Sequence, residues 1–351
     1  MSAINSINTG SEFIWNRYRH NFSRHLLGVA RHLQTSLMDT LQRQCGYSDL
    51  RLGFSPYINL LGEGNKRLTD LADILGISRQ ACNQAIKQVE AAGYIARAAD
   101  PLDGRAWQLT LSERGKKLRR DGARIVAQLD QQFADIVGSE HVADASKSLG
   151  KICQHLSLGV DSPSLKAQNA MMGGWLPRLS DYVLQRLMEL TRGRGHDRLK
   201  LSFGQVLTLI GPAGGRIQQM AAAHDVSKQA ISAIATELEE LGYLQREADP
   251  LDARQVVLQF TARGLELIAD SVASVDQLEE EFAAIIGNAA LKRMNTTLYT
   301  LYCGLHLEQD IFEHRDTVDL SLLARQIQQQ LGHQDSRALA RLLLNPSQNT
   351  R

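Results

Sequence analysis

The feature that most constrains this chain is an internal repeat. The sequence matches itself at a constant shift of 149 residues, which pairs Ser78 with Ser227. The strongest block pairs AADPLDGR at residues 98–105 with EADPLDAR at residues 247–254, and the match runs without a gap over residues 54–115 of the first copy. Because solenoid repeats are much shorter, a period of this length indicates two copies of one domain fold.

Length and composition agree with two domains. The chain has 351 residues, of which 43% are hydrophobic, so each copy is large enough to bury a core of its own. No stretch approaches the run of about eighteen apolar residues that a membrane span needs. The N-terminus has neither a basic start nor an apolar secretory segment. We therefore expect a cytoplasmic protein that does not contact the membrane.

The copies diverge between Leu156 and Gly174, where Ser, Pro and Gly are mixed. We predict a first unit at residues 1–160, a second unit at 161–316 and a helical extension at 317–351, with the most repeated parts at about 54–120 and 203–268. The extension has apolar residues at helical spacing and is predicted to form a helical hairpin. It either packs back on the chain or joins two chains into a larger assembly.

Several kinds of chemistry have no support in the sequence. The four cysteines stand far apart without a CxxC pair, and the ten histidines are scattered. The sequence contains no HExxH, nucleophile elbow or P-loop motif. We therefore expect no catalysis, no metal and no cofactor. The net charge of +1 means that any attraction to nucleic acid must come from a local cluster of cations.

Each copy begins its repeated part with two short helices joined by a turn. In the first helix, apolar residues recur at positions i, i+3, i+4 and i+7, and Gly76 ends the stripe. The stripe is Leu68, Leu71, Ala72 and Leu75 in the first copy, and Ile217, Met220, Ala221 and His224 in the second. Because His224 replaces a leucine, we expect an imidazole at the edge of a core rather than a metal ligand or a base.

Ser78 and Ser227 stand where the second helix needs an N-cap, and Gly93 and Gly242 end it. Its predicted buried face is Ile231, Ile234, Leu238 and Leu241 in the second copy, and Cys82, Ala85, Val89 and Ala92 in the first. This alignment makes Cys82 a small core residue rather than a redox sensor. The opposite face is polar: Arg79, Gln80, Asn83, Gln84 and Lys87, against Lys228, Gln229, Ser232 and Thr236.

An alternating segment follows each of these helices and predicts a β-hairpin. Trp107, Leu109 and Leu111 share one face in the first copy, and Val256, Leu258 and Phe260 repeat the alternation in the second, although Val257 blurs it. Ser112 and Thr261 then cap a further long helix. Helix, turn, helix and hairpin is the order of a winged helix-turn-helix, whose second helix enters a major groove while the hairpin reaches a minor groove. Periodicity alone is also compatible with a helical pair that has a solvated polar face.

Both copies resemble the MarR family of bacterial transcription factors. The matching segments are SRQACNQAIKQVEAAGYIARAADPLDGRAWQLTLSERG and SKQAISAIATELEELGYLQREADPLDARQVVLQFTARG. The most specific part is the D-P-x-D-x-R wing followed by L-[ST]-x-x-G. The resemblance implies a mainly α fold with small β-hairpin wings and a dimer whose terminal helices interlock. Here one chain would supply both halves as a monomeric pseudo-dimer. The segments 15–41, 126–156, 175–190 and 275–307 look helical and are expected to build this shared body.

The resemblance also implies a function, which is sequence-specific binding of double-stranded promoter DNA, as a repressor on a pseudo-palindromic operator. Carried over residue by residue, the DNA-binding positions are Ser78, Arg79, Gln80, Asn83, Gln84, Lys87, Asp103 and Arg105 in the first copy, and Ser227, Lys228, Gln229, Ser232, Asp252 and Arg254 in the second. The arginines would lie at the wing tips, positioned by the aspartates. The residue between them is often basic in the family but is Gly104 or Ala253 here, so one groove contact is in doubt in each wing.

The two copies differ in charge. Cations gather in the first copy, and carboxylates gather in the second: Arg97, Arg105, Arg114, Lys116, Lys117, Arg119 and Arg120, against Glu237, Glu239, Glu240, Glu247 and Glu266. Because phosphate neutralisation supplies much of DNA affinity, we expect the first copy to dominate binding. The alternative is that the acidic residues lie on a solvated helix end and leave binding unaffected.

Many members of the family bind small aromatic acids, and Phe54, Tyr57, Trp175 and Phe203 lie in segments that could line such an effector pocket. Packing in the core is the competing explanation for each of the four. Redox sensing is poorly supported, because Cys45 follows the first helix, whereas the family's sensor cysteine lies early in it. A protein-interaction adaptor that has kept the fold and lost specific DNA binding is the alternative function.

Overall fold

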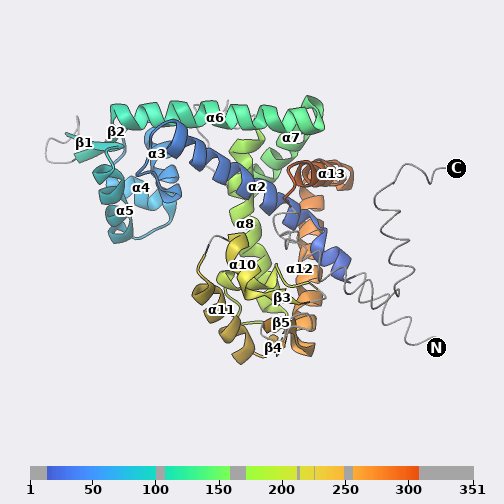
Figure 1. The fold of residues 1–351 in the computed structure, drawn as a ribbon. Coiled ribbons are helices and arrows are strands. Elements are labelled where there is room, and N and C mark those ends of the chain that lie inside the picture. The colour runs from blue at the N-terminus through green and yellow to red at the C-terminus, as the bar shows by residue number, and fades with distance from the viewer. Residues whose placement is uncertain are drawn as a thin grey trace, which may run out of the picture.

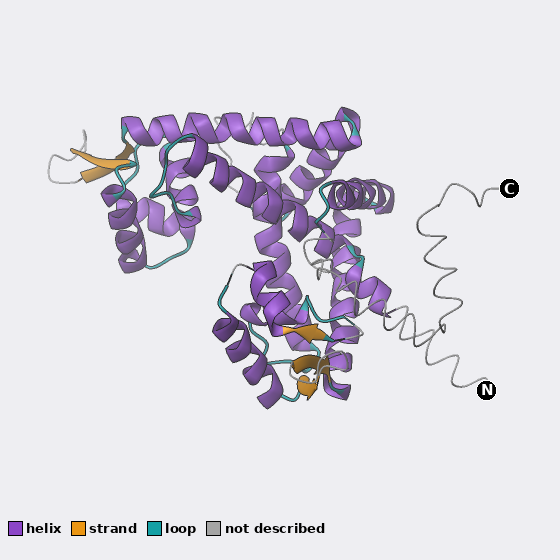
Figure 2. Cartoon of the chain, viewed as in Figure 1, coloured by secondary structure: helices purple, strands orange, loops and turns teal. Residues whose placement is uncertain are grey.

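The computed structural model describes residues 14–99, 107–158, 171–211, 214–224, 226–248 and 256–307. In these ranges the chain is mainly helical, with two small antiparallel sheets (Figure 2), which confirms the predicted fold class. None of the helices described is long and apolar enough to cross a bilayer.

Two winged units lie at separate ends of the molecule (Figure 1). The first unit contains η2 (Leu52–Phe54), α3 (Ser55–Leu61), α4 (Leu68–Leu75), α5 (Arg79–Ala91), β1 (Ile95–Ala99) and β2 (Trp107–Leu111). The second unit contains η5 (Leu201–Phe203), α9 (Gly204–Leu207), β3 (Gly215–Arg216), α10 (Ile217–His224), α11 (Lys228–Glu240), β4 (Leu244–Ala248) and β5 (Val256–Phe260). The hairpins have the same register, with Ile95 opposite Leu111 and Leu244 opposite Phe260.

A helical body joins the two units. It consists of α2 (Phe22–Asp39) with its π-helical continuation η1 (Thr40–Gln44), α6 (Glu113–Val137), α7 (Ser139–His155), α8 (Met172–Gly193), α12 (Ala262–Ile286) and α13 (Asn288–Gly304). Helix α2 packs on α8 and α13, and α7 packs on α8 and α13, so the two halves of the chain interlock. The long helices α6 and α12 lead from the winged units into the body (Figure 1).

Two of the four predicted body helices are interrupted by glycine. Gly138 has φ 91° and separates α6 from α7, and Gly287 has φ 85° and separates α12 from α13. Positive φ strains any residue with a Cβ, so glycine at these positions breaks the helix where the apolar pattern continues. The segments 126–156 and 275–307 are therefore helical as expected, but each is divided between two helices.

The repeat extends well beyond the part that the sequence reveals. Helices α6 and α7 correspond to α12 and α13 at the same shift of 149 residues. In α2 and α8, however, the burial patterns match at a shift of 150 residues: Phe22, Leu26, Val29 and Leu33 correspond to Met172, Leu176, Leu179 and Val183, all of them buried. The π-helical turn η1 accommodates the extra residue of the first copy, as π-bulges do.

A serine or threonine and a glycine lock each hairpin against the helix that follows. Ser112 Oγ donates to Gly93 O at 2.6 Å and accepts from Gly115 N at 3.0 Å. A Cβ on Gly115 would lie 2.1 Å from Tyr94 O, and the same distance separates a Cβ on Gly264 from the corresponding tyrosine carbonyl. The motif L-[ST]-x-x-G therefore reflects a helix start that contacts backbone directly.

The hydrophobic cores of the two units are organised differently. Buried residues of the first unit, such as Leu71 and Ile86, form one continuous cluster with those of the helical body. The second unit has a cluster of its own, which includes Phe203 and Ile231. The first unit and the body therefore share one cluster of buried residues, whereas the second unit has a separate cluster.

Candidate nucleic-acid interface

Each winged unit presents one helix that starts with a serine cap. Ser78 Oγ accepts from Ala81 N at 3.1 Å at the start of α5, and Ser227 Oγ accepts from Ala230 N at 3.1 Å at the start of α11. A cap of this kind satisfies an amide that a helix start leaves without a partner. Each hydroxyl keeps its proton, which is available for donation to an acceptor outside the protein.

The buried face of these helices differs from the prediction by one position in the middle. The residues that are fully buried are Cys82, Ile86 and Val89 in α5, and Ile231, Ala235 and Leu238 in α11. Ala85 and Ile234, predicted for this face, are half-buried at its edge. The buried stripe follows positions i, i+4 and i+7. In the second copy the prediction took the larger Ile234 for a buried position that Ala235 occupies.

The opposite face of both helices meets solvent. Its exposed side chains are Ser78, Arg79, Gln80, Gln84 and Lys87 on the first unit, and Ser227, Lys228 and Gln229 on the second, while Asn83 and Ser232 are half-buried. In Figure 1, α5 and α11 lie on the same side of the molecule, away from α13 and the two termini. Each unit therefore exposes one polar helix on this side of the molecule.

An arginine on the first hairpin strand binds the end of the polar helix in both units. Arg97 Nε lies 3.1 Å from Glu90 Oε1, and Arg246 Nε lies 3.1 Å from Glu239 Oε2. Arg246 also donates to Thr236 Oγ1 at 3.0 Å. Sequence reasoning missed these pairs, and it counted Arg97 as a free cation. The signal was present, because Glu and Arg stand seven residues apart in both copies.

A second pair of counterpart contacts has a neutral partner in the first unit and a charged partner in the second. Arg51 Nη1 donates to the neutral Gln88 Oε1 at 3.4 Å, whereas its counterpart Lys200 forms an ion pair with Glu237. The carboxylates at positions 237 and 239 thus have cationic partners inside the second unit. Their negative charge is partly compensated, which reduces the difference in charge predicted from the sequence.

The remaining cations of the first copy lie along α6. Lys116 Nζ pairs with Glu113 Oε1 at 2.7 Å, and the guanidinium of Arg114 lies over the ring of Tyr94 at 4.8 Å. Lys116 and Arg114 are therefore engaged within the unit. On α5, Arg79 and Lys87 are exposed, and no ion-pair partner is seen for them among the described residues. The cationic character of the first unit's polar face rests on these two side chains.

The structure describes the strands of both hairpins but not the wing tips between them. Leu109 and Leu111 are buried, but Trp107, on the same face of β2, is 62% exposed because it lies where the hairpin projects beyond the unit. In the second unit Val257 is buried against the turn at Gly214, which explains its break in the alternation. Asp103, Arg105, Asp252, Arg254, the side chain of His224 and residues 317–351 lie outside the described residues.

The four aromatic residues considered for an effector pocket do not come together. Phe54 and Tyr57 belong to the core shared by the first unit and the body, and Phe203 belongs to the separate core of the second unit. Of the four, Trp175 alone lines a hollow, an open surface depression of about 400 Å³ between α7 and α8. The hollow is also lined by Gly150, Lys147 and Lys151.

The cysteines are structurally ordinary. Cys82 and Cys153 are buried, and burial raises the pKa of Cys153 to about 12, which keeps it a thiol. Cys45 is half-buried and Cys303 is exposed. In the described part of the chain, no three His, Cys, Asp or Glu side chains are grouped so that they could hold a metal ion.

The fold and the two exposed helices define a tandem winged helix-turn-helix protein. The MarR family model matches the chain twice, at residues 57–106 and 205–255, once in each unit. Each winged unit is therefore similar to the MarR family, and the twofold match is consistent with the tandem arrangement that the sequence resemblance implied. No curated protein matches it.

Solved structures that resemble the chain each match about one of its two halves. CouR from Rhodococcus jostii RHA1, bound to p-coumaroyl-CoA, is 26% identical, with a TM-score of 0.30, and the match covers 37% of this chain and 90% of that one. A MarR-family regulator from Rhodococcus sp. RHA1 is 24% identical, with a TM-score of 0.32 and coverage of 40% and 96%. A variant of S. aureus MepR bound to an oligodeoxyribonucleotide is 16% identical, with a TM-score of 0.28 and coverage of 37% and 96%.

Proposed function

We propose that this chain is a transcriptional regulator that binds double-stranded promoter DNA with both winged units. One polypeptide would act as a pseudo-dimer on a pseudo-palindromic operator. The observation that carries the proposal is the pair of serine-capped helices, each with a polar exposed face, on one side of the molecule. Side chains such as Arg79 and Gln80 have the donor and acceptor groups that read base edges in a major groove.

The half-sites would differ. Positions 79, 83 and 87 carry Arg, Asn and Lys on α5, whereas their counterparts on α11 are Lys, Ser and Thr. Thr236 is also engaged by Arg246, so α11 has fewer groups available for base contacts. We therefore propose that the first unit supplies most of the affinity and most of the sequence discrimination.

The mode of regulation we propose is repression by occupation of a promoter, with release by a small aromatic effector. The hollow beside Trp175 is the place we propose for such a molecule, because it lies between two helices of the body that connects the units. A small acid that binds there should weaken DNA binding. Titration of candidate acids against a preformed complex with DNA tests this step separately from DNA binding itself.

Fluorescence anisotropy with duplexes from the promoter of the chain's own gene, at two salt concentrations, tests the main proposal. Arg79→Ala should lower affinity for the bound duplex by about tenfold or more and leave binding to unrelated DNA little changed. Lys292→Ala is the matched control, since Lys292 is an exposed cation on α13 in the helical body. Equal effects of the two substitutions would contradict the proposed interface.

The same experiment distinguishes the alternative function. An adaptor that has kept the fold without specific recognition should bind all duplexes weakly, and its binding should fall steeply with salt whatever the sequence. A regulator should prefer one duplex by a factor of about 10³ or more at physiological salt.

A further inference from the structure

The N-terminal segment, residues 14–24, lies across the second winged unit although it belongs to the first copy. Tyr18 Oη donates to the carbonyl of Leu207 at 3.1 Å, and Arg24 Nη2 donates to the carbonyl of Thr208 at 3.1 Å. Both carbonyls lie at the C-terminal end of α9, where a helix leaves oxygens without partners inside the helix. The ring of Trp15 also lies 5.8 Å from that of Phe260 in β5.

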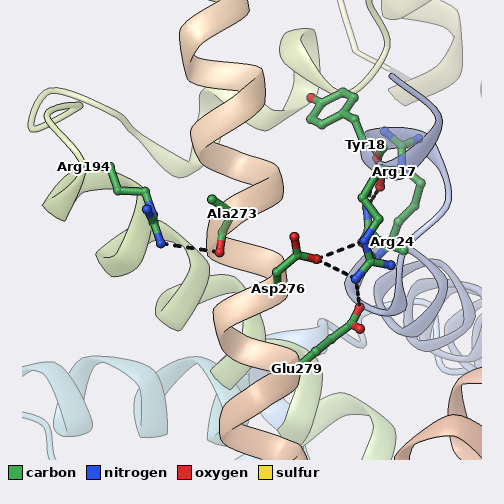
Figure 3. Close-up of polar contacts among 8 residues, drawn as sticks. Arg17, Tyr18, Arg24, Arg194, Ala273, Asp276 and Glu279 are labelled. Carbon is green, nitrogen blue, oxygen red and sulfur yellow. Dashed lines mark hydrogen bonds and ion pairs between the residues drawn. The ribbon is translucent and has the colours of Figure 1, made fainter. Parts of the chain in front are cut away.

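The same segment is fixed to α12 by Arg17. Its Nη2 atom lies 2.7 Å from Asp276 Oδ1 and 2.9 Å from Glu279 Oε1, and its Nε atom donates to the same aspartate oxygen at 3.0 Å. Figure 3 shows Arg17 reaching both carboxylates of α12, with Tyr18 and Arg24 from the same N-terminal segment close by. The Arg17 side chain is only 26% exposed, so water screens this contact less than an ordinary surface pair.

The first unit has no such segment of matching sequence. At the shift of 150 residues that applies before η1, Trp15, Arg17, Tyr18 and Arg24 correspond to Leu165, Ala167, Gln168 and Gly174. On the helix side, Asp276 corresponds to Ala127, and Glu279 corresponds to Asp130. Asp130 is already engaged, because it accepts from Met172 N at 2.9 Å and from Gly173 N at 3.0 Å at the start of α8.

This difference in sequence between the two copies coincides with the division of the core. The first unit shares a continuous apolar cluster with the body, and the second unit does not. The continuous helix α12, polar contacts at the junction and segments that bridge the two parts must then hold the second unit at its angle. The N-terminal segment contacts both α12 and the second unit, so it is placed to do this.

We propose that residues 14–24 act as a strap that fixes the second winged unit relative to the helical body, and thereby sets the distance between α5 and α11. Arg17 and Tyr18 are the positioning residues of this strap. For DNA recognition, which rests on the function proposed above, the strap determines which spacing of half-sites the chain accepts. Without it, the second unit would sample several angles and tolerate several spacings.

Hydrogen exchange of the full chain without DNA tests the strap directly. In the variant Arg17→Ala with Tyr18→Phe, peptides covering residues 203–211 and 256–260 should exchange about tenfold faster, and peptides of α3, β1 and β2 should not change. Arg293→Ala is the matched control, because it breaks a comparable ion pair, with Asp144 at 2.8 Å, inside the body. Unchanged exchange in the second unit, or equal changes in both units, would overturn the proposal.

Asp276→Asn tests the strap independently if the variant Arg17→Ala with Tyr18→Phe fails to fold. It removes the carboxylate partner of Arg17 from α12 without altering the N-terminal segment, and it should increase exchange in the same peptides by a smaller factor. No change in those peptides would count against the strap.

Duplexes whose half-sites are moved apart or together by one base pair provide the second readout. The wild-type chain should prefer one spacing, and the strap variant should bind the series more evenly, with a preference reduced about tenfold. A variant that keeps the full preference contradicts the strap's role in spacing. If the wild-type chain binds no duplex specifically, the proposed function is wrong. The hydrogen-exchange experiment still tests the strap in that case.

Discussion

The two winged units have the same elements but are joined to the helical body by different chemistry. At the first junction, Leu41 and Ile125 are buried apolar residues that belong to the shared core. Their counterparts at the second junction are Thr191 and Ser274, which are also buried and are joined by a hydrogen bond of 3.1 Å. The replacement of apolar side chains by hydroxyls explains why the core is continuous on one side and divided on the other.

A second set of counterpart residues forms hydrogen bonds in both junctions, but with one more contact in the second. Tyr47 Oη donates to Asp121 Oδ2 at 2.8 Å in the first junction. In the second, His196 bridges Tyr243 Oη at 2.9 Å and Asp270 Oδ2 at 3.0 Å. Polar contacts depend on direction, whereas apolar packing depends mainly on area, so the second junction specifies an angle with little buried hydrophobic surface. The difference shows that two copies of one fold can be attached to the same body in different ways, one mainly by apolar packing and the other mainly by hydrogen bonds.

The largest effect is expected from the glycines that contact a tyrosine carbonyl. Gly115→Ala or Gly264→Ala would bring a Cβ to 2.1 Å from backbone oxygen, which should cost more than about 3 kcal/mol of unfolding free energy. Because the first core is continuous with the body, Gly115→Ala should lower the stability of the whole chain. Gly264→Ala should unfold the second unit alone. Thermal unfolding followed by hydrogen exchange distinguishes the two, and identical behaviour would contradict the divided core.

A pH effect should be confined to one half of the body. His25 is buried between Tyr299 and Tyr302, and burial lowers its pKa from 6.5 to about 4, helped by the charges of His20, Arg24 and Arg17. Since the unfolded chain binds this proton more tightly, stability is complete above pH 6.5, falls as the pH drops to about 4, and then levels off. The loss should be on the order of 3 kcal/mol.

The counterpart of His25 is Trp175, an aromatic residue that does not titrate. A non-titrating aromatic residue at position 25 is therefore a suitable control. His25→Phe should remove most of the pH dependence of unfolding between pH 6.5 and 4. Denaturant unfolding of both chains at several pH values measures it. An unchanged slope in the variant would show that another group controls acid sensitivity.

The wing arginines allow a test of the proposed dominance of the first unit. Arg105→Ala should weaken DNA binding by about tenfold and lower the slope of log affinity against log salt by about one. Arg254→Ala should have the smaller effect, because α11 has fewer groups available for contacts with DNA, since Thr236 is engaged by Arg246. Equal losses in salt-dependent anisotropy would mean that both units contribute alike.

Much of the fold could be predicted from the repeat. Two copies allowed each helix to be compared with its counterpart, which located the serine caps, the hairpins and the polar faces correctly. The extra residue in η1 was not predictable, because a π-helical turn shifts burial without changing the apolar period of the helix. The breaks at Gly138 and Gly287 depend on positive φ, which an isolated glycine in an apolar pattern does not reveal.

The candidate site was predicted less completely than the fold. Sequence reasoning found the exposed residues of α5 and α11, because amphipathic periodicity separates them from the core. It treated Arg97 and the acidic residues of α11 as free charges, although contacts between strand and helix neutralise them in pairs. It also assigned residues 1–160 to the first unit, and so it did not anticipate that residues 14–24 contact the second unit.

The smallest effect should come from making the second junction resemble the first. Ser274→Ala alone leaves the buried hydroxyl of Thr191 without its acceptor and should cost about 1 kcal/mol. Replacing both partners, as Thr191→Leu with Ser274→Ile, should be close to neutral, because apolar groups then meet across the junction as Leu41 and Ile125 do. The double variant should also make the second unit's hydrogen exchange insensitive to loss of Arg17, because a continuous core would then hold the unit in place of the strap. If exchange in that variant still rises when Arg17 is removed, polar junction chemistry is not what divides the core.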